Sequence, residues 1–280
     1  MSEVTLESQL FDIIKDKEMA EHIKMAKFDM LVMLGVDVNA KTNGGSTALM
    51  WASSNGHKEV VELLIEKGAD IEAKDRSGWT SLMFASEWGH SEVVKLLLEK
   101  GADIEAKNIS IMIASRRGYS EIVKLLLENG ADINQKDNDG DTALMKASSE
   151  GRKEVVELLI QKGVDVHQKG EDGWTALMRA SRRGHKEVVE LLIQNGADIN
   201  QKDNDGWTAL MRASENSYKE IVELLIQKGA NVNQKNNKGQ NALMCTDNGV
   251  VRKAIIEAVK TRNIKESGRF IGSIKNLFES

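Results

Sequence analysis

One stretch decides the fold of this chain, and it reads Asp172-Gly173-Trp174-Thr175-Ala176-Leu177-Met178-Arg179-Ala180-Ser181-Arg182-Arg183-Gly184. Its Thr-Ala-Leu-Met core begins at Thr175 and recurs, with small changes, at positions 47, 80, 142, 208 and 241. These positions lie 33 residues apart, except that one unit of 29 residues is inserted between positions 80 and 142. A fixed period of this length indicates a repeat protein built from one small supersecondary unit.

Each unit is predicted to form two short antiparallel helices. The polar turn Asp172-Gly173-Trp174 precedes Thr175, whose hydroxyl suits the N-cap of a first helix. Gly184 ends that helix, and a second one follows over 186–194, where Val, Leu and Ile form an apolar stripe at helical spacing. Helices this short bury their apolar faces only by stacking on the next unit, so we expect a single domain with one continuous core.

These residues resemble the ankyrin repeat family, whose unit is a β-turn followed by two antiparallel helices with a motif similar to D-x-x-G-x-T-P-L-H-x-A. The resemblance spans about Thr42 to Lys260 and implies an all-α solenoid of stacked helix-turn-helix units with β-turn or hairpin fingers. The chain departs from the motif because it has no proline and carries Ala or Ser after the threonine. It also carries Met in place of the motif's His, so the family's threonine–histidine hydrogen bond is absent.

The repeat register predicts a degenerate N-terminal capping repeat, a run of ankyrin repeats and a C-terminal element. The predicted ranges are 1–41 for the cap, 42–74, 75–107, 108–136 (shortened), 137–169, 170–202, 203–235 and 236–260 (divergent) for the repeats, and 261–280 for an amphipathic cap helix or tail. The C-terminal stripe of Phe270, Ile271, Ile274, Leu277 and Phe278 suits a cap on the last repeat, or a helix that contacts a partner or a membrane surface.

The shortened repeat lacks the Asp-x-x-Gly-x-Thr turn, so we expect its finger to be missing. Two interpretations stay open. The deletion is either a tolerated loop change or a gap in the row of fingers that admits part of a partner.

Composition excludes several classes of protein. The chain is 41% hydrophobic and 29% charged, which is typical of a folded protein, and it contains no apolar run long enough to cross a membrane. A formal net charge of −5 argues against non-specific coating of nucleic acid or anionic membrane. The N-terminus lacks the pattern of a secretory signal. We therefore expect a monomeric cytoplasmic protein without membrane insertion, while export as an effector by another route stays open.

No catalytic motif is present. The sequence lacks a P-loop, a dinucleotide-binding glycine fingerprint, a nucleophile elbow and an H-E-x-x-H zinc motif. A single cysteine, Cys245, and five histidines without zinc-ligand spacing indicate neither a disulfide nor a metal site. We expect no enzyme activity, no cofactor and no metal.

The resemblance implies that a partner binds in a concave groove formed by the fingers and the first helices. Carried over unit by unit, the groove positions gather aromatic residues in the first third of the chain and basic residues in its middle. The candidate partner-binding residues are Trp51, Trp79, Phe84, Trp88, Arg116, Arg117, Lys146, Trp174, Arg179, Arg182, Arg183, Trp207 and Arg212.

Three interpretations of these residues remain. Trp and Arg dominate interface hot spots, which favours a non-enzymatic protein-protein interaction scaffold whose partner presents acidic and apolar side chains. The alternative is a binder of nucleotides or short single-stranded nucleic acid, which would use Trp stacking and Arg–phosphate contacts; the ankyrin domain of the oligoadenylate-activated ribonuclease carries similar Gly-Trp-Thr-Ala boxes. Otherwise, the aromatic residues only fill space between repeats and the arginines only solvate a face.

Overall fold

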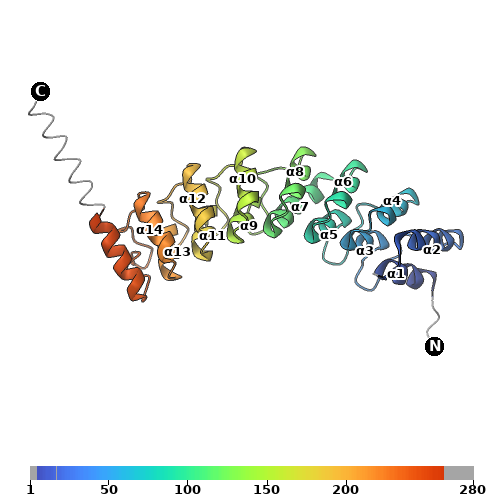
Figure 1. Cartoon of the computed structure of the whole chain (residues 1–280), viewed down its shortest axis with the longest axis horizontal. Coiled ribbons are helices and arrows are strands. Elements are labelled where there is room, and N and C mark those ends of the chain that lie inside the picture. Colours follow the sequence, from blue (N-terminus) through green and yellow to red (C-terminus); the bar gives the residue numbers. More distant parts are fainter. Residues whose placement is uncertain (1–4, 17, 262–280) are drawn as a thin grey trace, which may run out of the picture. The chain divides into compact units, whose positions relative to one another are not determined.

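The computed structural model describes residues 5–16 and 18–261, and within these ranges its regular elements are all helices. The predicted all-α architecture of stacked helix-turn-helix units is confirmed (Figure 1). The chain divides between Gln135 and Lys136 into two compact units.

Unit 1 contains the first four pairs of helices. Their bounds are α1 (Leu6–Lys15), α2 (Glu21–Met33), α3 (Ala48–Asn55), α4 (Lys58–Glu66), α5 (Ser81–Trp88), α6 (Ser91–Glu99), α7 (Ile104–Arg117) and α8 (Ser120–Glu128). Helices α1, α3, α5 and α7 pack on one another in sequence order, and α2, α4, α6 and α8 form a second row behind them.

Unit 2 repeats the same arrangement. Its helices are α9 (Ala143–Ser149), α10 (Lys153–Gln161), α11 (Ala176–Arg183), α12 (Lys186–Gln194), α13 (Ala209–Glu215) and α14 (Lys219–Gln227), followed by a further helix over 249–261. Helix α11 packs between α9 and α13, and α12 packs between α10 and α14.

The sequence pattern sets the ends of the first helices. In α11, the Oγ1 of Thr175 accepts a hydrogen bond from the backbone N–H of Met178 at 3.3 Å, as expected of an N-cap. Gly184 ends the helix with φ +86°, a left-handed conformation that glycine adopts without steric cost. Ala180 and Ser181 are fully buried, and their small side chains allow the neighbouring first helices to approach closely.

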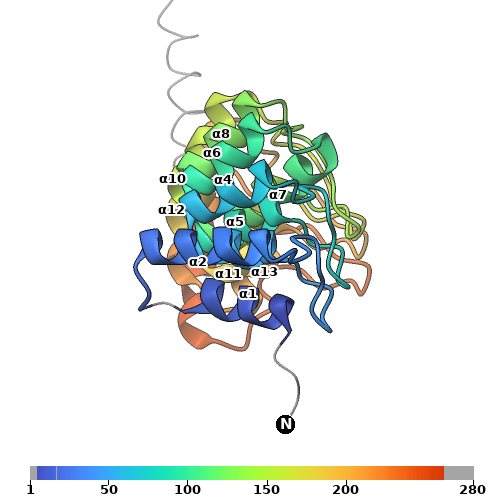
Figure 2. The same cartoon turned by 90° about the vertical axis from the view of Figure 1, so that its right-hand side faces the viewer.

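The turns before the first helices form the predicted fingers, which lie together on one side of the helices in each unit (Figure 2). In the finger at 137–141, Gly140 donates its N–H to the carbonyl oxygen of Asp137 at 2.9 Å. The next finger joins this one through a hydrogen bond from Glu171 N–H to the Asp139 carbonyl oxygen at 3.1 Å. Successive fingers in unit 2 are therefore linked through the backbone.

The shortened repeat has no finger, as predicted, and a longer helix takes its place. Helix α7 begins at Ile104, where the Asp103 carboxylate accepts the backbone N–H of Ala106 at 2.7 Å. The helix reaches Arg117 in a single run of 14 residues. Consequently the preceding finger has no following finger beside it, and a Cβ placed on Gly78 would meet nothing within 4 Å.

None of the described helices is both long enough and apolar enough to span a membrane. From residue 262 onward, the predicted C-terminal cap or tail lies outside the described residues.

Backbone linkage between fingers can be tested with two glycines that share a positive φ. A Cβ on Gly140 (φ +73°) would lie 2.6 Å from the backbone nitrogen of Glu171, whereas Gly78 (φ +82°) faces open space. Both Gly→Ala changes cost about 1–2 kcal/mol through the left-handed φ. We expect Gly140→Ala to lose roughly a further 1–3 kcal/mol from overpacking, measured by urea unfolding. Equal losses would contradict the close contact between fingers.

Candidate functional site

In unit 2 the predicted Trp and Arg residues come together around the Arg212 guanidinium. Its central carbon lies 4.3 Å from the ring centroid of Trp174 and 4.3 Å from that of Trp207. Both tryptophans belong to fingers and Arg212 belongs to α13, so the cation contacts aromatic rings of successive repeats. Cation–π contacts in such a partly buried site each contribute on the order of 1 kcal/mol.

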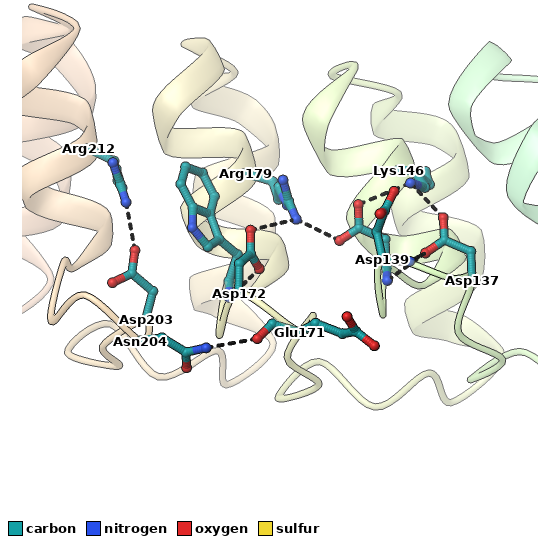
Figure 3. Close-up of polar contacts among 11 residues, drawn as sticks. Asp137, Asp139, Lys146, Glu171, Asp172, Arg179, Asp203, Asn204 and Arg212 are labelled. Carbon is teal, nitrogen blue, oxygen red and sulfur yellow. Dashed lines mark hydrogen bonds and ion pairs between the residues drawn. The ribbon is translucent and has the colours of Figure 1, made fainter.

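A buried carboxylate pairs with this cation. The Asp203 side chain is 1% exposed and accepts Arg212 Nη2 at 2.7 Å (Figure 3). Its other oxygen accepts the backbone N–H groups of Asp205 at 3.0 Å and Trp207 at 2.8 Å. Asp203 thus fixes its own finger and the Arg212 side chain at the same time.

The same pair occurs in the first repeat of unit 2, with lysine as the cation. Lys146 Nζ lies 2.7 Å from Asp137 and 3.0 Å from Asp141. Asp141 also accepts Arg179 Nη2 at 2.7 Å, so this buried carboxylate joins two repeats. Arg179 has Gly170 where the other repeats have Asp137 or Asp203, and it pairs with Asp172 instead, at 3.1 Å.

The pKa values reflect this pairing. Burial raises the pKa of Asp137, but hydrogen bonds from Lys146 and from backbone N–H groups outweigh burial and hold the pKa below its ordinary value. Burial lowers the pKa of Lys146, and the carboxylates of Asp137 and Asp141 raise it above its ordinary value. Both groups therefore stay ionised at neutral pH.

Arg182 and Arg183, at the end of α11, differ from these paired cations. Both side chains are exposed, and neither forms an ion pair with any residue in 5–16 or 18–261. The Arg182 guanidinium carbon lies 5.2 Å from the Trp174 ring centroid, above an indole that is 8% exposed. We call Arg182 and Arg183 the arginine pair.

In unit 1 the predicted aromatic residues gather at α3 and α5. Trp51, Phe84 and Trp88 line one cavity of about 360 Å³, and Trp79 packs against Phe84 with ring centroids 5.3 Å apart. Trp88 is 60% exposed, while the other three rings are half-buried. We call this cavity the aromatic pocket.

Arg116 and Arg117 both contact the Glu87 carboxylate, with Arg116 Nη2 at 3.1 Å. Burial raises the pKa of Glu87, but the hydrogen bonds and charges of Arg117 and Arg116 outweigh it and lower the pKa below its ordinary value. Arg116 and Arg117 therefore both form ion pairs with a carboxylate of the preceding repeat, unlike the arginine pair of unit 2.

Little on the described surface suggests reaction chemistry. Burial, followed by the Glu215 carboxylate, raises the pKa of the Cys245 thiol. Since the thiolate is the nucleophilic form of cysteine, this thiol is poorly reactive at neutral pH. Among the described side chains, no group of three or more His, Cys, Asp or Glu could hold a metal ion.

Sequence reasoning located the aromatic and basic residues but missed their partners. Asp141, a finger residue, is 7% exposed and pairs with two cations. One signal was available, since Asp137 precedes Lys146 and Asp203 precedes Arg212 by the same nine positions. Lys15, whose Nζ lies 4.6 Å from the Trp51 ring centroid, carried no repeat signal because it belongs to the divergent N-terminal segment.

Comparisons with known proteins support the assignment of ankyrin repeats. A model of three ankyrin repeats matches residues 19–108 and 111–203, and a model of many ankyrin repeats matches residues 183–226. The crystal structure of the human ASB11 ankyrin repeat domain is similar, with a TM-score of 0.70 and 25% sequence identity; the match covers 76% of this chain and 98% of that one. A search of curated protein sequences finds no match.

The ion pair between Arg212 and Asp203 should contribute to the free energy of unfolding. We expect Arg212→Met to lower the free energy of unfolding by about 3 kcal/mol, because it leaves the buried Asp203 charge without its cation. The double variant Arg212→Met/Asp203→Asn removes that charge and keeps an acceptor oxygen for the finger N–H groups, so part of the loss should be recovered. Urea unfolding measures both, and a double variant no more stable than the single one would contradict this role for the pair.

The pairing of Lys146 also predicts a pH dependence. Because the folded pKa of Asp137 is depressed, its contribution to stability is present above about pH 3.8, the ordinary value, and is lost as pH falls through the folded pKa. Because the folded pKa of Lys146 is raised, its contribution is present below about pH 10.5 and is lost as pH rises through the folded pKa. The stability difference between wild type and Lys146→Met should therefore be greatest between these limits and shrink outside them. A difference independent of pH from 3 to 11 would rule out the ionic contribution.

Proposed function

This chain belongs to the ankyrin repeat family, and we propose that it is a non-enzymatic scaffold that binds a protein partner through its first helices and fingers. Ankyrin repeats generally mediate protein-protein interactions and are generally non-enzymatic. The partner presents acidic side chains to unit 2 and apolar side chains to unit 1. In this proposal the protein acts as a cytoplasmic monomer.

The observation that carries the proposal is the arginine pair. Arg179, Arg212 and Lys146 are neutralised by carboxylates, whereas Arg182 and Arg183 are exposed and have no ion pair within the described part of the chain. Two adjacent arginines beside a buried tryptophan suit charge-assisted hydrogen bonds to a partner's carboxylates. An acidic partner surface would therefore complement this end of α11.

The second helices carry a different kind of surface. Several of their lysines pair with glutamates one helical turn away, as in Lys153 with Glu157 at 3.5 Å and Lys219 with Glu223 at 3.6 Å. Exposed pairs of this type contribute little to stability and mainly keep the surface solvated. We therefore place the partner on the first helices rather than on the second helices.

Nucleotide binding finds less support. A phosphate near Arg179 or Arg212 would meet Asp141, Asp172 and Asp203, which already occupy these guanidiniums. Trp174 is nearly buried beneath three arginine side chains, so its ring is not open for base stacking.

The arginine pair gives the direct test of the proposal. We expect Arg182→Glu/Arg183→Glu to reduce recovery of the native partner from cell lysate by about tenfold or more, because each hot-spot contact contributes roughly 1–2 kcal/mol or more. The affinity of the native partner for the wild-type chain should also fall as salt is added. Quantitative mass spectrometry of the captured proteins measures the change.

The matched control changes the same number of charges on the second helices. Lys153→Glu/Lys186→Glu alters exposed residues of α10 and α12 and should leave partner recovery unchanged. Unchanged recovery with the arginine variant, or equal losses with both variants, would contradict binding through the first helices.

A further inference from the structure

The aromatic pocket of unit 1 is defined by its walls. It lies between α3 and α5, measures about 360 Å³, and is lined by Ser46, Met50, Trp51, Ser54, Asn55, Phe84 and Trp88. This volume is at the lower end of the range for small-ligand sites and accommodates one bulky side chain. We infer that the aromatic pocket receives a single bulky apolar side chain from an acidic segment of the partner; this inference rests on the proposed function and specifies the partner's chemistry.

The pocket walls are mostly apolar, and two of their groups lack a partner among the described residues. Trp88 exposes 60% of its surface, although burial of an aromatic side chain away from water is favourable. The Nε1 of Trp51 is buried and has no hydrogen-bond acceptor within the described residues. An inserted side chain would cover the exposed Trp88 ring.

The positive charge around the pocket favours an acidic segment of the partner. Lys15 is exposed, its Nζ lies 4.6 Å from the Trp51 ring centroid, and it forms no ion pair with a described residue. Glu87, next to Trp88, is already paired with Arg116 and Arg117. The unbalanced charge beside the pocket is therefore positive.

The same charge argues against a cationic occupant. Aromatic walls alone would also suit an ammonium group, because a cation is attracted to the face of an aromatic ring. Here the Lys15 ammonium group already lies over the Trp51 ring, and its positive charge would repel a second cation.

The aromatic walls of the pocket stand at positions where unit 2 carries basic residues. Trp51 and Phe84 occupy the position between Met and Ala of the first helix, and the equivalent residues of unit 2 are Lys146, Arg179 and Arg212. These side chains are held in ion pairs with finger carboxylates. The pocket therefore comes from this chain's own substitutions rather than from the repeat scaffold.

The test uses three peptides and the indole N–H signals of the ¹⁵N-labelled full chain, assigned by Trp→Phe variants. The peptides are acetyl-DEFDE-amide, acetyl-DEADE-amide and acetyl-KKFKK-amide. We expect the first peptide to shift the Trp51 and Trp88 signals in a saturable way. The other two should bind at least about tenfold more weakly, because the Ala peptide has no Phe side chain to bury and the charge of the basic peptide is repelled by Lys15.

Two pairs of variants locate the binding site. Ser54→Leu fills the pocket and should weaken acetyl-DEFDE-amide by about tenfold or more, whereas Ser149→Leu changes the equivalent residue of α9 and should have no effect. Lys15→Glu should weaken the same peptide, and Lys27→Glu, on α2, should not. Far-ultraviolet circular dichroism and urea midpoints check that each variant is folded.

Several outcomes would overturn the inference. These are no shift of Trp51 and Trp88 with the acidic Phe peptide, equal binding by Ser54→Leu, or tighter binding of the basic peptide, which would indicate a cationic occupant. Signals that move on dilution without peptide would indicate a second copy of the chain in the pocket. If the peptides fail while partner recovery still depends on Arg182 and Arg183, the pocket assignment is wrong and the proposed function stands.

Discussion

The structure depends on the close stacking of first helices, because no helix pair of this length buries its apolar face alone. Ala180 and Ser181 of α11, like Ala147 and Ser148 of α9, are fully buried where neighbouring helices meet. Larger side chains at these points would separate the helices. The constraint fixes which positions of each unit face a neighbour, and it leaves the residue between Met and Ala free to vary.

That variable position distinguishes the two units. In unit 1 it carries Trp51 and Phe84, which leave an aromatic cavity, and in unit 2 it carries Lys146, Arg179 and Arg212, which pair with finger carboxylates. The paired cations serve the fold by fixing fingers to helices. Arg182 and Arg183 form no ion pair within residues 5–16 and 18–261, and in the proposed function they are the residues that contact the partner.

The fold was predictable because its signals repeat. The threonine N-caps, the glycines that end the first helices and the 33-residue period predicted the stacked helix pairs, and the missing turn predicted the missing finger. The extension of α7 back to Ile104 was not predicted, because it depends on the Asp103 cap that becomes available when the finger is absent. The ion pairs of Asp141 were also missed, since a carboxylate near a turn gives no sign in the sequence of which way it points.

The central claim is that a partner lies on the first helices and not on the second helices. Hydrogen exchange followed by mass spectrometry on the native complex tests it most directly, because it maps the covered backbone without any substitution. The account predicts slower exchange in the peptides that cover 176–183 and 48–55, compared with the free chain, and unchanged exchange over 153–161 and 186–194. Protection confined to the second helices would contradict it.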